Sequence, residues 1–394
     1  MSKILNGIRV LDFGRYIAGP FCATLLADLG ADVIRIEKPS GGEDRYTVPI
    51  SDQGEGAYHT QIGRNKRAIT LNPTSVEGRE VVRRLVATAD VVVANLPYPA
   101  LKKLGLDYET LKEIKQDIIL TTGSAFGATG PYASRGGFDT VAQAMSGAMY
   151  LSGSKDQPAK SFAPYNDFGT ASLSAFGTLA ALMHRQQTGE GQMVEGTLLG
   201  TALTFNNAPL MEEAIGGIGR QGSGTRGQYN APTDTYRTKN GHITVQVVGA
   251  GIYKRWARLM GEEAWLDDPR FDSDQSRGDH GEIIGQRMSH WCEQRTNQEV
   301  LTELTQAGIP CGEMLTPREV LENEHIVAAN MFQYCEYPGV EIPAPIADHP
   351  IRYSKTKVAK FTRAPTLGEH TTEVLSQVGY TSQQINELKT KGII

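Results

Sequence analysis

The chain has 394 residues, of which 40% are apolar and 21% are charged. Its 39 Lys and Arg residues and 44 Asp and Glu residues give a net charge of −5. These values exclude a disordered chain, a collagen, a disulfide scaffold and a basic nucleic-acid-binding protein. No apolar run approaches the roughly 18 to 20 residues of a membrane-spanning helix. At roughly 150 residues per domain, the length predicts two or three domains.

The first 40 residues have the pattern of a strand, a helix and a second strand. Residues 8–13 and 33–36 are short apolar runs rich in β-branched side chains, and residues 20–29 carry apolar residues at helical spacing. Pro20 suits the first helical position, and Gly30 suits the residue just past the helix end. Two strands around one helix predict a βαβ unit and hence a parallel sheet.

The same alternation continues downstream, which predicts an open α/β sheet. Asp107 is expected to cap one of the helices, and a long helix is expected to end at Gly189. The expected strands cover residues 67–71, 89–94 and 118–122, and the expected helices cover residues 77–88, 106–115 and 168–187.

The sequence changes character after residue 207. A glycine-rich segment, residues 214–227, precedes a hairpin signal at Asn240-Gly241. Helices are then expected at 253–259, 282–294 and 369–379, with a connector at 309–312 and a polar stretch at 337–360. We therefore predict a large α/β domain (1–205), a linker (206–224), a small α+β domain (225–325) and a C-terminal return to the large domain (326–394).

The turn after the first expected strand, residues 14–20, is a candidate anion site. Arg15 and the N–H groups near Ala18 could hold a phosphate at a helix N-terminus. Glu37 ends the second strand, as the ribose-binding acid does in dinucleotide folds. The turn lacks the G-x-G-x-x-G pattern, however, and Pro20 removes one N–H donor. A purely structural turn is the alternative.

Asp167 directly precedes the long helix, and two interpretations of it remain open. Asp is among the best N-cap residues. It could instead be a nucleophilic carboxylate that the helix N–H groups keep ionised. The loop from Gly222 to Gln228, with Gly224 and Arg226 inside it, is similarly ambiguous. It is either a flexible linker between domains or a segment that closes over a reacting centre, where Arg226 or Gln228 could bind a carboxylate.

Metal chemistry and a secreted protein are not expected. The eight histidines form neither an HExxH nor an HxH pattern. The N-terminus has no apolar run of signal-peptide length. The four cysteines are scattered without CxxC spacing, which predicts reduced thiols in a cytoplasmic protein. They are Cys22, Cys292, Cys311 and Cys335.

Several separate motifs, in order along nearly the whole chain, resemble the class III CoA-transferase family. They include Leu5-Asn-Gly-Ile-Arg-Val, Asp28-Leu-Gly-Ala-Asp-Val, Phe138-Asp-Thr-Val-Ala-Gln and Leu367-Gly-Glu-His-Thr. The resemblance implies an interlocked homodimer of ring-like chains with CoA bound on the large domain. It implies that acyl-CoA and a small carboxylic acid are the substrates and that no metal or tightly bound cofactor is needed. Charge and hydropathy already predict no nucleic-acid or membrane partner. It places the family's nucleophilic Asp, which forms an acyl anhydride and then an aspartyl-CoA thioester, on Asp167.

The resemblance also implies a set of CoA and substrate contacts. Lys103 stands where the family usually has an Arg, so the charge stays but bidentate phosphate binding is lost. Leu96 replaces an aromatic residue beside Asn95. The loop Gly222 to Gln228 corresponds only approximately to the tetraglycine loop of formyl-CoA transferase. The expected CoA contacts are Arg15, Tyr16, Ala18, Lys38, Leu71, Asn95, Leu96, Lys103 and Arg135, and the expected substrate contacts are Phe138, Gly222, Gly224, Arg226 and Gln228.

A racemase of 2-methylacyl-CoA is the alternative within the family. Racemization needs a base on each face of Cα, and racemases of the family use a His in a Gly-His-Asp segment. Here that segment reads Gly137-Phe138-Asp139, which favours transfer. A CoA-binding module without catalysis and an NAD-dependent oxidoreductase are more distant alternatives. The acceptor stays open among carnitine or crotonobetaine, oxalate or formate, and succinate-like dicarboxylates.

Overall fold

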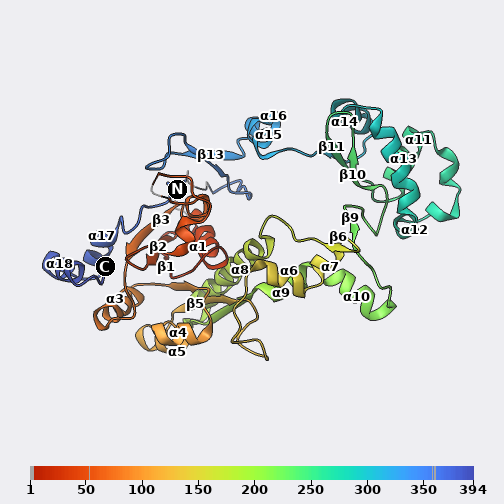
Figure 1. Ribbon diagram of the computed structural model, residues 1–394. Coiled ribbons are helices and arrows are strands. Elements are labelled where there is room, and N and C mark those ends of the chain that lie inside the picture. Colours follow the sequence, from red (N-terminus) through yellow and green to blue (C-terminus); the bar gives the residue numbers. More distant parts are fainter. Residues whose placement is uncertain (1–3, 53, 357, 359–360) are drawn as a thin grey trace. The chain divides into compact units, whose positions relative to one another are not determined.

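The structure is a computed structural model that describes residues 4–52, 54–356, 358 and 361–394. The first three residues, and three positions of the expected polar stretch 337–360, lie outside the described residues. The chain forms two compact units (Figure 1). The larger unit contains residues up to 146, residues 161–209 and residues 328–394, and the second unit contains residues 147–160 and 210–327.

Six parallel strands form the sheet of the larger unit, in the order β3-β2-β1-β4-β5-β8. The predicted open parallel sheet is therefore confirmed. The strand order reverses between β1 and β4, and ligands of such sheets bind at the carboxyl ends of the strands beside that reversal. The strands are β1 (Arg9–Asp12), β2 (Asp32–Glu37), β3 (Lys66–Thr70), β4 (Val91–Ala94), β5 (Ile119–Ser124) and β8 (Met193–Thr197).

Helices cover both faces of this sheet because successive strand residues point to opposite sides. Val10 packs in the cluster with α1 (Ala18–Asp28) and α8 (Tyr165–Thr188). The next residue, Leu11, packs in the cluster on the other face. That face is covered by α3 (Val76–Ala87), α4 (Tyr98–Leu104), α5 (Tyr108–Ile114), α17 (Thr371–Gln377) and α18 (Ser382–Thr390).

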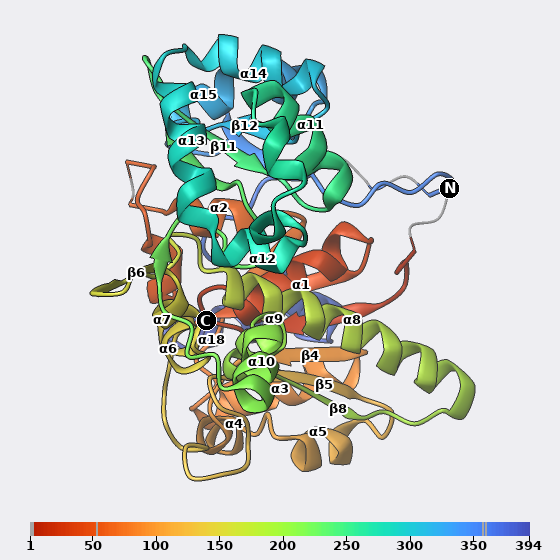
Figure 2. The same cartoon turned by 90° about the vertical axis from the view of Figure 1, so that its right-hand side faces the viewer.

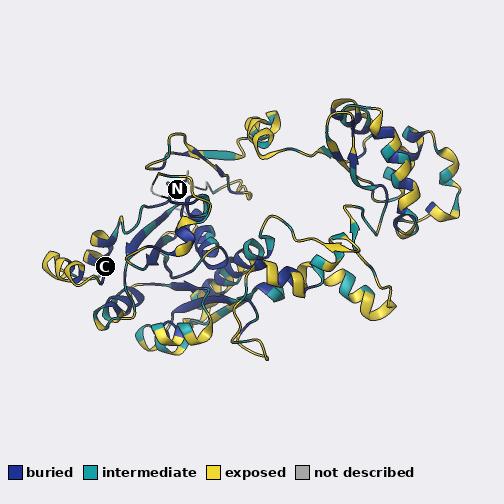
Figure 3. Ribbon diagram, viewed as in Figure 1, coloured by how far each residue is buried: buried dark blue, intermediate teal, exposed yellow. Residues whose placement is uncertain are grey.

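The strands at the centre of the sheet are buried on both faces, as Figure 3 shows by the dark blue of the sheet. All four residues of β4 are buried, and each buried Val contributes about 1.5 to 3 kcal/mol of transfer free energy. Helix α8 runs along β5 and β8 (Figure 2). The remaining elements of this unit are α2 (Ala57–Ile62), the 3-10 helix η1 (Glu43–Tyr46), α6 (Asp139–Met145), α9 (Leu198–Phe205), β13 (Phe332–Cys335) and β14 (Ala344–Ala347).

The start of α1 differs from the sequence prediction. The helix begins at Ala18, with Ile17 as its N-cap, so Pro20 is its third residue and not its first. A proline is tolerated there because the first N–H groups of a helix have no partner within the helix. The prediction for Asp107 is confirmed, because its side chain caps α5 by accepting from the N–H of Thr110 at 3.3 Å.

The second unit is built around a three-stranded antiparallel sheet and a bundle of helices. The hairpin predicted at Asn240-Gly241 is confirmed as β10 (Thr233–Arg237) and β11 (His242–Gln246). The expected connector at 309–312 instead contains a third strand, β12 (Cys311–Glu313), which pairs with β11. The helices are α11 (Ala250–Met260), η2 (Glu263–Leu266), η3 (Pro269–Phe271), α12 (Asp274–Asp279), α13 (Gly281–Glu293), α14 (Asn297–Gln306), α15 (Pro317–Glu322) and α16 (Glu324–Ala328).

A second small sheet joins two distant segments of the second unit. Its strands are β7 (Gln157–Pro158), β6 (Gly153–Ser154) and β9 (Ser223–Gly224), and α7 (Ala148–Leu151) and α10 (Asn207–Gly216) flank them. Gly222 must be a glycine, because a Cβ there would lie 2.6 Å from the carbonyl oxygen of Gly153. This pairing explains why residues 147–160, which the sequence prediction placed in the large domain, belong to the second unit.

Candidate active site

A pocket of about 460 Å³ lies at the carboxyl ends of β1, β4 and β5, where the strand order reverses. The segments that follow these strands line it, together with the segment before α6 and the first turn of α8. Eight of the expected site residues meet there. They are Arg15, Tyr16, Ala18, Asn95, Leu96, Arg135, Phe138 and Asp167.

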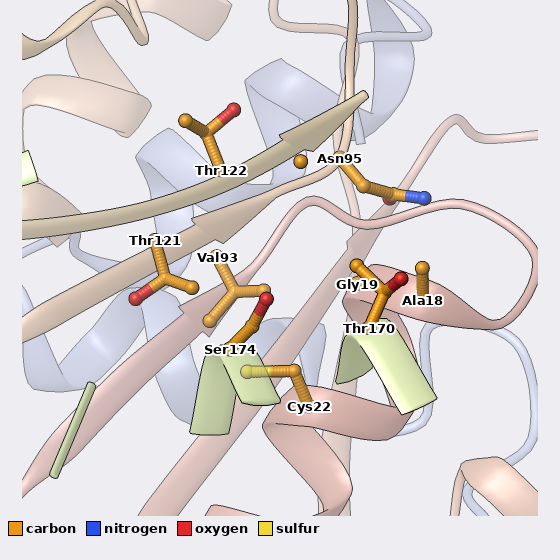
Figure 4. Close-up of a pocket in the computed structure, with 10 residues that line it drawn as sticks. Ala18, Gly19, Cys22, Val93, Asn95, Thr121, Thr122, Thr170 and Ser174 are labelled. Carbon is orange, nitrogen blue, oxygen red and sulfur yellow. The ribbon is translucent and has the colours of Figure 1, made fainter. Parts of the chain in front are cut away.

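Asn95 ties the turn after β1 to the end of β4. Its Oδ1 accepts from the N–H of Arg15 at 2.6 Å, and its Nδ2 donates to the carbonyl of Arg15 at 2.9 Å. Gly19 leaves room for this amide, because a Cβ at Gly19 would lie 2.5 Å from Oδ1 of Asn95. Figure 4 shows the two residues side by side at a small adjoining pocket of about 10 Å³, which has room for about one water molecule. The amide of Asn95 thus shapes the pocket wall.

A buried ion pair also binds the backbone of the turn after β1. Nζ of Lys66 donates to Oδ2 of Asp12 at 2.8 Å and to the carbonyl of Pro20 at 2.7 Å, and Oδ1 of Asp12 accepts from the N–H of Gly14 at 2.8 Å. Burial alone would raise the pKa of Asp12, but the ammonium of Lys66 and the guanidinium of Arg35 hold it below its usual range. The pair therefore holds both ends of the turn in place.

Of the two interpretations of Asp167, the one that makes it the N-cap of the long helix is wrong. Helix α8 begins three residues earlier than Phe168, its N-cap is Pro164, and Asp167 is its third residue. The side chain that takes the first N–H groups belongs to Asp139, at the start of α6. Its Oδ1 accepts from the N–H of Asn166 at 2.7 Å and from the N–H of Asp167 at 3.2 Å.

The second interpretation, in which the helix N–H groups keep a nucleophilic Asp167 ionised, is therefore wrong about those N–H groups. Burial, and then the nearby charge of Asp139, raise the pKa of Asp167 to about 7 from an ordinary value of 3.8. A carboxylate without compensating donors is poorly stabilised as an anion, and so it is a better nucleophile than one in water.

Aromatic rings form one wall of the pocket. The rings of Tyr16 and Phe138 meet edge to face with centroids 5.2 Å apart. Tyr16 has a φ of 57°, a left-handed conformation that non-glycine residues adopt at a cost and that is common at functional sites. The guanidinium of Arg135 stacks on the ring of Tyr132 at 3.9 Å. No carboxylate of the described residues pairs with Arg135, so it is available for an anionic ligand.

The remaining expected site residues lie elsewhere. Leu71 is fully buried in the core against α3, so its side chain offers no surface to a ligand. Lys38 pairs with Glu43, and Lys103 lies exposed in the last turn of α4. The glycine-rich loop belongs to the second unit. There Ser223 Oγ donates to the carbonyl of Arg226 at 2.7 Å, and Gln228 Nε2 donates to that of Gln221 at 2.8 Å. Gly222 directly precedes β9, and Gly224 is its last residue.

No sequence pattern had indicated the residues that hold the site together. Asp139 and Gln143 occur in the motif Phe138-Asp-Thr-Val-Ala-Gln, and their spacing of four residues places both on one face of a helix. That spacing could have indicated a linked pair. Lys66 carried no comparable signal, because its partner Asp12 is 54 residues away in the sequence.

The described residues contain no group of three or more His, Cys, Asp or Glu side chains placed to hold a metal ion. Among these residues, no helix is both long and apolar enough to cross a membrane.

Comparisons with known proteins identify a family and several relatives. Residues 5–371 match the model of CoA-transferase family III. The chain is 32% identical to a succinate–glutarate CoA-transferase of Agrobacterium fabrum over 95% of each protein. It is 32% identical to a succinyl-CoA:mesaconate CoA-transferase of Haloarcula marismortui over 95% of this chain and 96% of that protein. A CaiB/BaiF family protein of Brucella suis has a similar structure, with a TM-score of 0.83, 32% identity and coverage of 96% and 100%.

The chain therefore belongs to CoA-transferase family III and is a CoA-transferase enzyme. This confirms the resemblance that the sequence motifs indicated. CoA thioesters are its substrates. The racemase alternative is not favoured, and no histidine is among the described residues that line the pocket.

Proposed function

We propose that the enzyme transfers CoA from succinyl-CoA, or a similar dicarboxylyl-CoA, to a short dicarboxylic acid, with Asp167 as the nucleophile. The observation that carries the proposal is Asp167 itself, a partly buried carboxylate with a raised pKa on the wall of a 460 Å³ pocket. The relatives over nearly the whole chain, whose names contain succinate, glutarate and mesaconate, support a dicarboxylate as acceptor.

The reaction we propose has four exchanges and needs no further reactant. An Oδ of Asp167 attacks the thioester carbonyl, the C–S bond breaks, and CoA leaves as a thiolate. The thiolate attacks the aspartyl carbonyl of the resulting anhydride and releases the donor acid. The acceptor carboxylate attacks the aspartyl-CoA thioester and releases the thiolate again. Attack of the thiolate on the new acyl group then restores Asp167. Holding the reactants together in the pocket makes these attacks feasible.

The residues around the pocket divide between CoA and the acyl group in this proposal. The backbone of the turn at Arg15, Tyr16 and Ala18 faces CoA, with Leu96 and Asn95 beside it. Arg135 supplies positive charge for a phosphate or carboxylate. Lys103, which has no carboxylate partner among the described residues, and Lys38, once it leaves Glu43, hold the phosphates at the rim.

We also propose that the enzyme is an interlocked homodimer in the cytoplasm. In this arrangement the loop with Gly222, Gly224, Arg226 and Gln228 covers the pocket of the partner chain. The support is the family resemblance. Light scattering should give the mass of a dimer at micromolar concentration, and a monomer would contradict this part of the proposal.

The test of the proposed function is a panel of acceptors with succinyl-CoA as donor. Glutarate and other short dicarboxylates should be converted, and pentanoate, which matches glutarate in length but lacks one carboxylate, should be a poor acceptor. Treatment with acyl-CoA and then hydroxylamine should modify Asp167, which peptide mass analysis detects. Preference for oxalate or carnitine would contradict the acceptor class, and modification of another carboxylate would contradict the nucleophile.

A further inference from the structure

We infer that Asp139 is a positioning residue for the reaction: its carboxylate occupies the N–H groups at the start of α8 and so denies them to Asp167. This inference rests on the proposed role of Asp167 as nucleophile. It goes beyond that role because Asp139 acts through the charge and the backbone of Asp167 and not on the substrate.

The carboxylate of Asp139 is fixed at both oxygens. Its Oδ1 accepts from the N–H groups of Asn166 and Asp167, at 2.7 and 3.2 Å. Its Oδ2 accepts from Nε2 of Gln143, one turn along α6. Oε1 of Gln143 in turn accepts from the N–H of Ser161 at 2.9 Å. Asp139 and Gln143 are buried, so the hydrogen bond between their side chains is shielded from water.

This arrangement changes what a helix N-terminus does for Asp167. Free N–H groups and the helix dipole normally stabilise an anion in the first turn. Here both N–H groups point at Asp139, and the carboxyl oxygens of Asp167 accept no hydrogen bond from the described residues. The negative charge of Asp139 also faces Asp167.

The other charged groups around the pocket do not offset the effect of Asp139 on the charge of Asp167. Arg15 lines the pocket, but its guanidinium extends toward the segment that follows β2. Its Nη1 lies 3.0 Å from the position that a Cβ of Gly42 would occupy. Arg135 is stacked on Tyr132. Tyr165, in the same turn of α8, is a phenol whose pKa burial and Asp139 raise, so it stays neutral. Within the described part of the chain, the anion of Asp167 therefore meets one fixed negative charge and no paired cation.

The consequence for catalysis follows from the charge of Asp167 in each state. The free carboxylate is negative, whereas its anhydride and its CoA thioester are neutral. Repulsion by Asp139 therefore destabilises the free carboxylate and not the covalent intermediates. An interaction that raises the free energy of the reactant state relative to the bond-forming state accelerates attack.

The test uses two variants of the full-length enzyme. Asp139→Asn keeps an oxygen that accepts the α8 N–H groups but removes the charge. Its amide would face the amide of Gln143, so the second variant adds Gln143→Glu. In this double variant the new carboxylate at position 143 accepts from the N–H of Ser161 and from the new amide at position 139. Every hydrogen bond that links Ser161, residue 143, residue 139 and the start of α8 is then kept, and the charge lies on residue 143 in place of residue 139.

We expect the acidic limb of the kcat/KM profile to lie near pH 7 in the wild type, about one pH unit lower in Asp139→Asn, and between these values in the double variant, since a like charge raises a carboxyl pKa and does so less from further away. Because one pKa unit corresponds to a factor of about ten in rate, we expect kcat above pH 8 to fall by up to about tenfold in Asp139→Asn, and by less in the double variant. The double variant should match the wild type in thermal stability. An acidic limb that stays in place in both variants would overturn the inference.

A second measurement does not depend on activity. The difference in melting temperature between the wild type and Asp167→Asn, taken at pH 5 and at pH 8, reports ionisation of Asp167 in the folded state. The change in this melting-temperature difference between pH 5 and pH 8 should be smaller when Asp139→Asn is added both to the wild type and to Asp167→Asn. If it shrinks while Asp167→Asn remains fully active, the proposed nucleophile is wrong and the electrostatic role of Asp139 stands. If it is unchanged, the role of Asp139 is wrong.

Discussion

The side-chain amide of Asn95 binds the backbone of Arg15 with both of its polar atoms, at 2.6 and 2.9 Å. Loss of these two hydrogen bonds should loosen the turn that we assign to CoA. We predict that Asn95→Ala raises KM for acyl-CoA about 5- to 30-fold, which corresponds to about 1 to 2 kcal/mol. Steady-state kinetics measures this, with Asn386→Ala on the exposed face of α18 as control. An unchanged KM would show that the turn does not depend on Asn95.

A methyl group at Gly19 should disturb the same contact from the other side. The Cβ of Gly19→Ala would lie 2.5 Å from Oδ1 of Asn95, so the amide must move. We predict a lower melting temperature and a higher KM for acyl-CoA. Gly251→Ala is the control, since a Cβ there meets no atom closer than 4.0 Å. Equal effects of the two substitutions would contradict the prediction.

The buried pair of Lys66 and Asp12 should be costly to break. Lys66→Met leaves the carboxylate of Asp12 buried without its ammonium partner, and such losses cost about 3 to 5 kcal/mol. We predict a marked drop in the midpoint of chemical denaturation. The carboxylate then keeps the more distant guanidinium of Arg35, at 3.7 Å, as its cationic partner. Adding Asp12→Asn removes this poorly paired charge, while Arg35 keeps Glu37 and Asp44 as partners, and should recover part of the loss. A double variant less stable than Lys66→Met would contradict this explanation.

Stability should depend on pH through Asp167. Its pKa is about 7 in the folded protein against an ordinary 3.8, so the folded state binds more protons than the unfolded state between these values. Stability is therefore lost as pH rises from about 4 to 7. Asp167→Asn cannot ionise and escapes this loss. We predict that the variant is inactive yet melts at a higher temperature than the wild type at pH 8, with a smaller gap at pH 5. A variant that is less stable at pH 8 would contradict the prediction.

Two adjacent lysines of α4 provide a matched test of the proposed phosphate contact. Lys103→Ala should raise KM for CoA esters by one to two orders of magnitude, or about 1.5 to 3 kcal/mol. Lys102→Ala removes the same charge from the neighbouring exposed position and should have a smaller effect. Equal KM values for the two variants would place the phosphate site elsewhere.

The sequence predicted the sheet well because its strands are apolar runs of a length and spacing that local patterns reveal. Val91 to Ala94, for example, is buried throughout. A short run of β-branched apolar residues like this one is typical of an inner strand of a parallel sheet. The strand β8 was missed because Met193 to Thr197 contains Glu195 and Gly196, and the strand lies at the sheet edge.

The site was predictable in its position but not in its electrostatics. A residue such as Tyr16 or Asn95 lies near the pocket because it follows a parallel strand, which sequence order reveals. The relation of Asp139 to Asp167 depends on how α6 and α8 meet, and no local pattern contains that information. The N-cap interpretation of Asp167 failed for this reason, because the capping side chain comes from 28 residues away.

The C-terminal helices complete the side of the larger unit that contains β3. Oγ1 of Thr371 accepts from the N–H of Thr70 at 3.1 Å, and the N–H of Asn72 donates to the carbonyl of Ile393 at 2.7 Å. These contacts join segments about 300 residues apart, and closing so long a loop is slow relative to forming local helices. During synthesis β3 is therefore expected to stay partly uncovered until residues 371–393 have left the ribosome. Chaperone dependence in the cell should accordingly be greatest just before residues 371–393 emerge, a timing set by chain connectivity.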